Sequence, residues 1–524
     1  MKNRYYLLIV LLITLAAPCA KAQTKVFKAV AEDMEQDFQA IFQDGKLVGY
    51  LIFTQLEKAS ADSFNYRISI MDENLNDIGS VTFREQKLNL KGVSFDQDVL
   101  CLAYVKTNFV GREYKNQKEY NRDAGTFSAA LFTQFLSLTG KVIATSNVRM
   151  DIAPEFVLAA NSNRHGFANG RLKHSIQIRN ISGKGFACFY GDEKKNNLVV
   201  FNAAGKMTWQ KAINENIVDV GLLPSGTDIN LLIKYDNNLV EGGYELLSYN
   251  AIDSTTYPKF MLKDRKGNSL KVLAFDNDPV TNKLFLSGMV IDPRHGDYHT
   301  TGKNLVHNPY DGVFNINING HTRKDIQAAF SYWSDGSQTI VDKHGYFEEA
   351  HAYAKVERSF RDYQGNTYFA ACGIERKPRW VAIGFSVVTL PLLLPPIVLM
   401  AMGTHKYTNR DVLLIKQDAA GKLSLANDIP TERSKRFPST VPMSMFDPRS
   451  YYTVANPDTH SNYLVIDQAK DVQIYNVDQK KIARTIPHKD GNNLLTVYPA
   501  KEGYVMVYDF NKKEKTTRLS IEAL

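Results

Sequence analysis

The sequence predicts an all-β protein assembled from repeated sheets. Short runs rich in Val, Ile, Leu, Tyr and Phe recur along the chain between Gly, Asn and Asp turns, whereas long segments with a 3.6-residue apolar period are scarce. Hydrophobic residues make up 44% of the chain and charged residues 23%, as in a folded protein. At 524 residues the chain exceeds the usual size of a single core, so either several domains or one repeat architecture must organise it.

A repeated hairpin favours the repeat architecture. Each copy has a strand, a turn with Gly-Lys or a similar polar step, and a further strand. The clearest copies surround Gly140-Lys141, Gly205-Lys206 and Gly421-Lys422, and weaker copies lie at residues 70–81, 246–255, 313–322, 472–482 and 505–516. Repeats of four short strands are typical of a β-propeller, in which each blade buries its faces against neighbouring blades.

We therefore predict a β-propeller of seven or eight four-stranded blades over residues 23–524, with one apolar hairpin inserted in a blade. The alternative is a pair of packed β-domains separated near residues 325–350, where the pattern is least regular.

Several short segments resemble repeats of exported bacterial β-propeller proteins. The segment DYQGNTYFA at residues 362–370 is similar to the D-x-x-G-N-x-Y-V pattern of these proteins, and DPVTNKLFLSG at residues 278–288 is similar to the repeat of YVTN-type surface propellers. Residues 198–209 resemble the G-K-x-x-W ending of quinoprotein-type blades. The resemblance implies a fold and no particular activity. The residues that a quinone would need have no match, so no cofactor is expected.

The N-terminus has the pattern of a cleaved export signal. Lys2 and Arg4 precede the uncharged residues 5–17, and Ala20-Lys21-Ala22 supplies small residues for cleavage, which predicts a signal peptide at residues 1–22. The alternative is lipidation at Cys19, although Pro18 before it fits that processing badly. The mature protein is expected in the periplasm, at the outer membrane or outside the cell.

The charge does not favour a nucleic-acid partner. The whole chain has 63 Lys and Arg against 55 Asp and Glu, a net charge of +8. Removing residues 1–22 takes away three positive groups and leaves 60 against 55, or +5. These charges are dispersed, without a Lys or Arg block. We therefore expect no nucleic-acid binding.

Three cysteines remain after such cleavage. Cys101, Cys188 and Cys372 each lie in an apolar run and form no C-x-x-C pair. An odd number of isolated cysteines in strand-like runs predicts buried hydrophobic side chains in place of a disulfide framework.

An uncharged segment of 23 residues, Trp380–Met402, interrupts the repeats within a basic-flanked insertion at 376–410. Its length suits a membrane-spanning helix. Pro391, Pro395 and Pro396 oppose that helix, because proline removes a backbone donor and clashes with the preceding turn.

The flanking strands also oppose a single span. The strand ending near Glu375 and the strand starting near Asp411 are expected partners in one blade, whereas a span would place them on opposite sides of a membrane. We therefore predict a hairpin of two apolar arms that turns at the prolines.

The apolar hairpin has three possible roles. It can fold back on its own propeller, contact a membrane surface or apolar partner, or form a true span. For the contact role we predict these binding residues: Trp380, Phe385, Leu390, Leu392, Leu393, Leu394, Ile397 and Leu399.

No catalytic or metal site is predicted. The dinucleotide, Walker, nucleophile-elbow and zincin motifs are absent from the sequence. The metal-capable residues His295, His299 and His307 fit a solvated loop, and Glu348, Glu349 and His351 fit the polar positions of an outer strand. The aromatic pairs Tyr332-Trp333 and Tyr451-Tyr452 are the loop aromatics expected to be available for stacking on sugars.

The sequence thus favours an exported cell-envelope propeller that binds or scaffolds an unknown protein or glycan, with possible membrane-surface contact, over an enzyme. The alternative is a hydrolase or lyase that acts on an extracellular polymer at the propeller axis. Inward carboxylates or histidines around the axis would favour the enzyme, and small or neutral residues would favour the binding protein.

Overall fold

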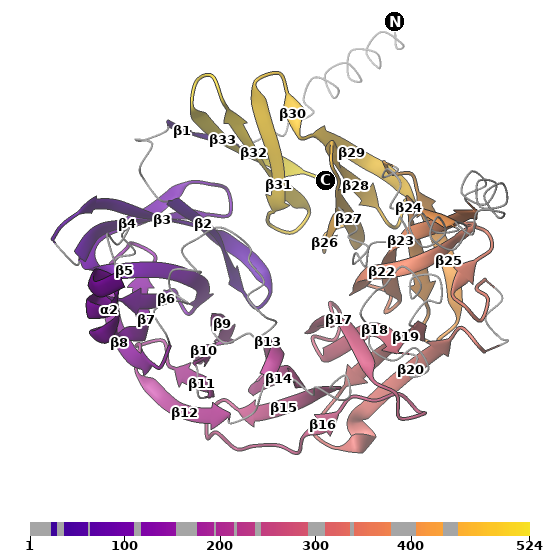
Figure 1. Cartoon of the computed structure of the whole chain (residues 1–524), viewed down its shortest axis with the longest axis horizontal. Coiled ribbons are helices and arrows are strands. Elements are labelled where there is room, and N and C mark those ends of the chain that lie inside the picture. The colour runs from indigo at the N-terminus through magenta and orange to yellow at the C-terminus, as the bar shows by residue number, and fades with distance from the viewer. Residues whose placement is uncertain are drawn as a thin grey trace, which may run out of the picture.

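The computed structural model describes residues 23–28, 36–60, 63–108, 117–152, 176–192, 195–213, 217–235, 243–291, 310–335, 340–378, 405–432 and 449–524. Over these residues antiparallel sheets stand in a ring about a central axis (Figure 1). The described helices are one α-helix, α2 (Gln117–Gly125), and one turn of 3₁₀-helix, η2 (Arg323–Asp325). The predicted all-β propeller fold is confirmed.

The described residues form seven hydrogen-bonded sheets, and the largest of these contains two blades. Strand β5 (Asp77–Asp96) is 20 residues long. Its first half pairs with β4 and its second half with β6. Blade one comprises β2 (Gln36–Gln43), β3 (Lys46–Lys58), β4 (Ser63–Asp72) and the first half of β5, and blade two comprises the second half of β5, β6 (Val99–Thr107), β7 (Ala129–Ser137) and β8 (Val142–Met150).

Blades three to five each have four strands in sequence order. Their strands are β9 (Ile176–Ile181), β10 (Gly185–Gly191), β11 (Asn196–Phe201) and β12 (Met207–Ile213); β13 (Ile217–Ser225), β14 (Asp228–Tyr235), β15 (Tyr244–Asn250) and β16 (Phe260–Met261); and β17 (Leu270–Asn277), β18 (Leu284–Ile291), β19 (Tyr310–Ile318) and β20 (Ile326–Tyr332).

Blades six to eight complete the ring. Blade six has β22 (Ala352–Arg361), β23 (Thr367–Pro378), β24 (His405–Gln417) and β25 (Leu423–Ile429), with the short β21 (Tyr346–Phe347) beside β22. Blade seven has β26 (Ser450–Asn456), β27 (Ser461–Asp467), β28 (Asp471–Asn476) and β29 (Lys481–Pro487). Blade eight has β31 (Asn493–Pro499), β32 (Tyr504–Asn511), β33 (Thr516–Ala523) and β1 (Gln23–Lys28), with the short β30 (Lys489–Asp490) beside β31.

The hydrophobic core is divided into eight clusters, each shared by two consecutive blades. Strand β6 shows how the sequence builds them. Its residues Cys101 and Ala103 pack toward blade three, whereas Leu100, Leu102 and Tyr104 pack toward blade one. Side chains of a strand alternate between the two faces of its sheet, so an uninterrupted apolar run covers both faces at once. Eight blades among the described residues therefore share eight cores.

The two ends of the described chain close the ring. β1 pairs antiparallel with β33 and is the fourth strand of blade eight. Leu47 and Tyr50 of blade one pack with Met506 and Leu519 of blade eight in the closing cluster. Because blades five and six also share a core, the alternative of two domains separated near residues 325–350 does not describe the structure.

The predicted turns and buried cysteines are also confirmed. In the turn between β22 and β23, the Gly365 N–H donates to the Asp362 carbonyl at 3.2 Å, and the Asn366 N–H donates to the Asp362 carboxylate at 2.8 Å. Gly365 has φ of 80°, a conformation in which glycine lacks the steric penalty of other residues. Cys101, Cys188 and Cys372 are buried, unbridged strand residues.

A histidine connects blades seven and eight. His488 Nδ1 lies 3.1 Å from the Leu495 carbonyl oxygen, and its Nε2 lies 2.8 Å from both Asp467 Oδ1 and the Gln468 carbonyl oxygen. Every partner is an acceptor, so an imidazolium can donate from both nitrogens. Partial burial lowers the pKa of His488, but the hydrogen bond to Leu495 and the Asp467 carboxylate outweigh it, and the net pKa is raised.

We expect this contact to stabilise the protein more at low pH than at high pH. A raised folded-state pKa gives a contribution that is fully present below the ordinary histidine pKa of about 6.5 and is lost as the pH rises through the folded-state value. The His488→Gln variant should therefore lose more unfolding free energy at about pH 6 than at about pH 9. Urea unfolding of both proteins at the two pH values measures this difference, and an equal loss at both would contradict the assignment.

Candidate functional site

Connections of very different length leave the two faces of the ring. The connections between first and second strands, and between third and fourth strands, leave one face of the ring, which we call the turn face. In blades one to seven, whose four strands are consecutive in the sequence, the longest of these connections is 251–259. Those between second and third strands, and from one blade to the next, leave the opposite face, which we call the loop face. The five longest connections between named strands leave the loop face, at residues 108–128, 151–175, 292–309, 379–404 and 430–449.

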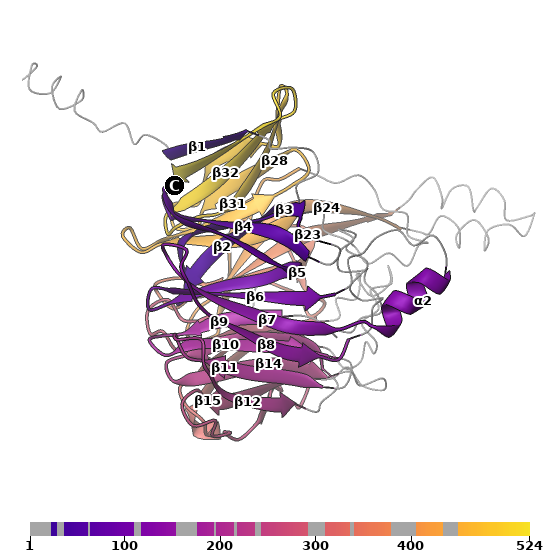
Figure 2. The ribbon, with the colours of Figure 1, turned by 90° about the vertical axis from the view of Figure 1, so that its left-hand side faces the viewer.

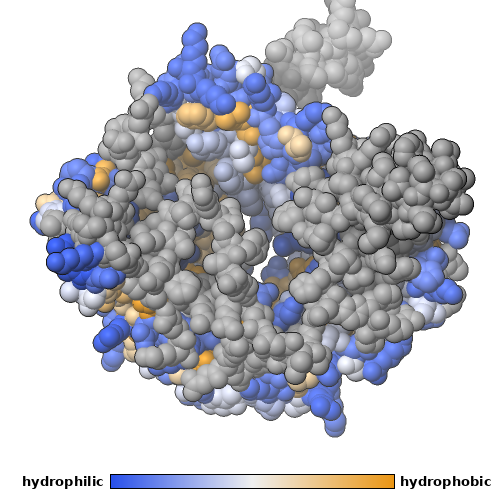
Figure 3. All heavy atoms as spheres, in the orientation of Figure 1, coloured by the Kyte–Doolittle hydropathy of each residue, from blue (hydrophilic) through white to orange (hydrophobic). Residues whose placement is uncertain are grey.

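The described part of the loop face shows two projecting features. Helix α2 stands out from this side of the ring, and β23 and β24 reach past the neighbouring strands in the same direction (Figure 2). Seen from the loop face, the ring has an opening at its centre in which both hydrophilic and hydrophobic residues are visible (Figure 3).

The β23–β24 ribbon carries the insertion. Its ladder runs from Thr367 opposite Gln417 to Pro378 opposite His405, so the strands are longer than the sequence predicted but are partners in one blade, as expected. The two ends of residues 379–404 therefore lie side by side on the loop face. The eight residues predicted for contact lie outside the described residues: Trp380, Phe385, Leu390, Leu392, Leu393, Leu394, Ile397 and Leu399. In the part of the chain that the structure describes, no α-helix is both long and apolar enough to cross a bilayer.

Two expectations about polar residues have different outcomes. His295, His299 and His307 lie outside the described residues. The prediction that Glu348, Glu349 and His351 belong to an outer strand is wrong, because all three are exposed residues of a turn between β21 and β22. The His351 N–H donates to the Glu348 carbonyl there, and this turn replaces strand pairing.

The expectation of loop aromatics is also wrong. Tyr332 ends β20, and Trp333 is only 2% exposed, with its ring 5.9 Å from that of Phe347 in the core of blades five and six. Tyr451 and Tyr452 lie within β26. These aromatic residues therefore belong to strands or to the packing between blades, and not to exposed loops.

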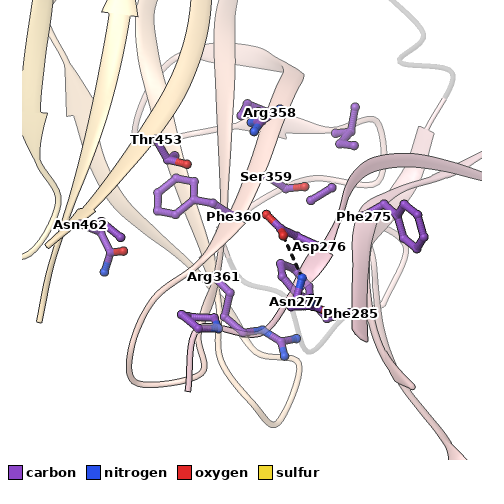
Figure 4. A pocket seen from close by; sticks show the side chains of 14 residues that line it. Phe275, Asp276, Asn277, Phe285, Arg358, Ser359, Phe360, Arg361, Thr453 and Asn462 are labelled. Carbon is purple, nitrogen blue, oxygen red and sulfur yellow. Dashed lines mark hydrogen bonds between the residues drawn. The ribbon is translucent and has the colours of Figure 1, made fainter. Parts of the chain in front are cut away.

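A cavity of about 210 Å³ lies beside the axis, between the first strands of blades five, six and seven (Figure 4). It is lined by residues of β17, β22 and β26 and of the segments beside them: Leu273, Ala274, Phe275, Asp276, Asn277, Pro279, Phe285, Arg358, Ser359, Phe360, Arg361, Thr453, Ala455 and Asn462. Most of these residues lie just before the turn that joins the first and second strands of their blade, which places the cavity toward the turn face. We call it the axial cavity.

Asp276 is the one carboxylate among these lining residues. Its side chain is exposed to the cavity, and Oδ1 accepts a hydrogen bond of 2.8 Å from the Asn277 N–H. The surrounding protein displaces water and raises the pKa of the Asp276 carboxyl, while that hydrogen bond and the guanidinium groups of Arg358 and Arg179 act in the opposite direction. Desolvation likewise lowers the pKa of Arg179, which lies on β9.

Arg361 has a structural role at the cavity wall. Its guanidinium donates to Asp278 Oδ2 at 2.9 Å and to Asn317 Oδ1 at 2.6 Å, and it lies 4.5 Å from the centre of the Phe285 ring. The Arg361 and Asp278 side chains are only 6% and 9% exposed. Burial raises the pKa of Asp278, but the hydrogen bonds from Thr281, Arg361 and Val280 outweigh it and lower the net pKa. This pair joins blades five and six.

The axial cavity could not be predicted from the sequence because β-bulges set its geometry. The ladder of β17 shifts register between Val272 and Ala274, and that of β22 shifts between Val356 and Arg358. A bulge inserts one residue and re-aims the side chains beyond it, so the simple alternation of a strand cannot tell which charged residue faces the axis.

Removing Arg361 should leave Asp278 as an uncompensated buried charge. We expect Arg361→Leu to lower the free energy of unfolding by about 3–5 kcal/mol, and the double variant with Asp278→Asn to lose less. Arg323→Leu, at an exposed position, should change it by at most about 0.5 kcal/mol. Denaturant unfolding measures all three, and a double variant that loses more than Arg361→Leu would refute the buried pair.

Comparisons with known proteins assign no activity to this chain. Residues 1–123 match a family model described as a family of unknown function, DUF6770. A search of curated proteins gave no match.

Solved structures with similar shapes have low identity to this chain. The WD40 domain of SCAP from fission yeast is 10% identical, with 96% of this chain and 98% of that chain covered and a TM-score of 0.40. Apo AztD from Citrobacter koseri is 8% identical, with 91% and 96% covered and a TM-score of 0.39. The Dos1 propeller is 8% identical, with 95% and 94% covered and a TM-score of 0.41. The propeller assignment rests on the eight shared cores of this chain.

Proposed function

We propose that this protein is an exported cell-envelope propeller that binds through its loop face and anchors to a membrane surface through the segment at the tip of the β23–β24 ribbon. The observation that supports this proposal best is the ribbon itself. Its ladder stays paired up to Pro378 and His405 and reaches past the neighbouring strands on the loop face. The 23 residues 380–402 beyond its end carry no charge.

The chemistry of the segment and its flanks suits an anionic lipid surface. Uncharged, largely apolar residues partition into the boundary between headgroups and acyl chains. Basic residues flank the segment on both sides, at Arg376, Lys377, Arg379, Lys406 and Arg410. Each basic side chain near an anionic surface contributes about 1 kcal/mol. Lys377 is exposed and is already paired with Glu375 at 2.9 Å, so its own contribution is reduced. The Arg410 guanidinium has a buried Nε and donates to the Ala350 carbonyl at 3.3 Å, so Arg410 does not count toward the lipid contact.

The ring gives this contact a fixed orientation. A segment that leaves and re-enters one blade at paired positions can dip into one leaflet without passing through the bilayer. The other long connections leave the same face, so a protein or glycan ligand bound there would be held next to the membrane. With the export pattern of residues 1–22, this proposal places the protein in the periplasm, at the outer membrane or on the cell exterior.

The test replaces residues 380–402 by a short Gly-Ser linker. Because Pro378 and His405 are opposite each other, such a linker can close the ladder and leave blade six intact. We expect the native protein to sediment with vesicles that contain anionic lipid and the variant to stay in the supernatant. In cells, the variant should move from the membrane fraction to the soluble fraction.

A matched control replaces residues 292–309, another long connection of the loop face, by the same linker. This control should sediment like the native protein. Unchanged sedimentation of the 380–402 variant would refute membrane anchoring. If the native protein does not sediment with vesicles, and residues 380–402 are needed for its crosslinking to one protein in cells, the segment binds a protein partner and not a membrane.

A further inference from the structure

We infer that the axial cavity is a binding site for a small carboxylate or phosphate monoester with an apolar or aromatic body. This inference is independent of the proposed membrane contact, because the cavity lies toward the turn face and the ribbon leaves the loop face.

The first reason is an available guanidinium group. Arg358 lines the cavity and is exposed, and its guanidinium makes no hydrogen bond or ion pair with any residue that the structure describes, although it acts electrostatically on Asp276. Its guanidinium has five N–H donors in a planar arrangement that matches the paired oxygens of a carboxylate or phosphate. Figure 4 shows Arg358 on the same side of the cavity as Ser359 and above Asp276.

The second reason is a set of buried donors without partners. Asn462 lines the cavity and is only 5% exposed, and its Nδ2 has no hydrogen-bond partner among the described residues. Arg361 Nε is likewise buried without a partner, and so is one acceptor of the lining, Asn277 Oδ1. Buried polar groups in native proteins are nearly always satisfied, so unsatisfied ones in a cavity wall indicate a polar ligand that binds there. A ligand with several oxygen atoms supplies acceptors for the two donors.

The third reason is charge. The charged residues that line the cavity are Arg358, Arg361 and Asp276, Arg179 also acts on Asp276, and Asp278 beside the cavity is the ion-pair partner of Arg361. Arg361 and Asp278 are paired with each other, which leaves two cationic groups against one carboxyl. The balance favours an anion.

The walls and the volume define the rest of the ligand. The side chains of Phe275, Phe285 and Phe360 line the cavity together with Leu273 and Pro279. A volume of about 210 Å³ accommodates a compact anionic group and a single small ring. Apolar walls with a few convergent polar groups are the usual composition of a small-molecule site.

The experiment measures binding by calorimetry with benzoate and phenyl phosphate as probes, and with benzylamine as a cationic probe of similar size. We expect both anions to bind and benzylamine not to bind. Tighter binding of benzoate would assign the natural ligand to carboxylates, and tighter binding of phenyl phosphate would assign it to phosphate monoesters. Absence of binding by both anions, or equal binding of benzylamine, would overturn the inference.

Variants locate the site. Arg358→Gln keeps the side-chain length but removes the charge, and we expect it to weaken anion binding at least about tenfold. Asn462→Leu should weaken it by a smaller factor. Arg323→Gln, an exposed arginine of η2 outside the cavity, should bind like the native protein. Because the Arg358 guanidinium has no hydrogen bond or ion pair among the described residues, and the variant loses only its electrostatic interaction with Asp276, Arg358→Gln should keep a melting temperature close to the native one. Unchanged anion affinity in Arg358→Gln would refute this site.

Discussion

The whole structure depends on the fact that each of its sheets is apolar on both faces. Strands such as β6 and β10 are buried at nearly every position, so neither face of blade two or blade three can be left in water. A sheet of this kind is stable only with a neighbour on each side. An open row of blades would leave two apolar faces exposed, one at each end, and only a closed ring removes both. Closure is therefore a requirement of the apolar pattern itself.

Two features of the chain meet this requirement. Strand β5 passes without interruption from the outer edge of blade one to the inner edge of blade two, which fixes the relative placement of the two blades through a continuous backbone. β1 completes blade eight, so the first and last described strands are hydrogen-bonded to each other. The antiparallel order also separates the connections by face, because successive strands end on opposite faces of the ring. Tight turns collect on one face, where the axial cavity lies, and long connections collect on the other.

Much of the fold could be predicted from the sequence, and much of the candidate site could not. Leu100-Cys101-Leu102-Ala103-Tyr104 indicates a strand buried on both faces, and Asp362, Gly365 and Asn366 indicate a tight turn, because both depend on local chemistry. The blade count stayed open at seven or eight because β5 joins two blades without a Gly or Pro turn between them. The roles of Asp276 and Arg358 were not predicted, because bulges and the packing of distant blades bring them together.

Closure of the ring is the feature on which the rest of the structure depends, and an engineered crosslink tests it directly. Thr24 of β1 lies opposite Ser520 of β33, although 496 positions separate them in the sequence. Cysteines introduced at both positions should form an intramolecular disulfide in the monomer, visible by mass spectrometry and non-reducing electrophoresis. Failure to form it, or disulfide-linked dimers as the main product, would contradict a ring closed by the first and last strands.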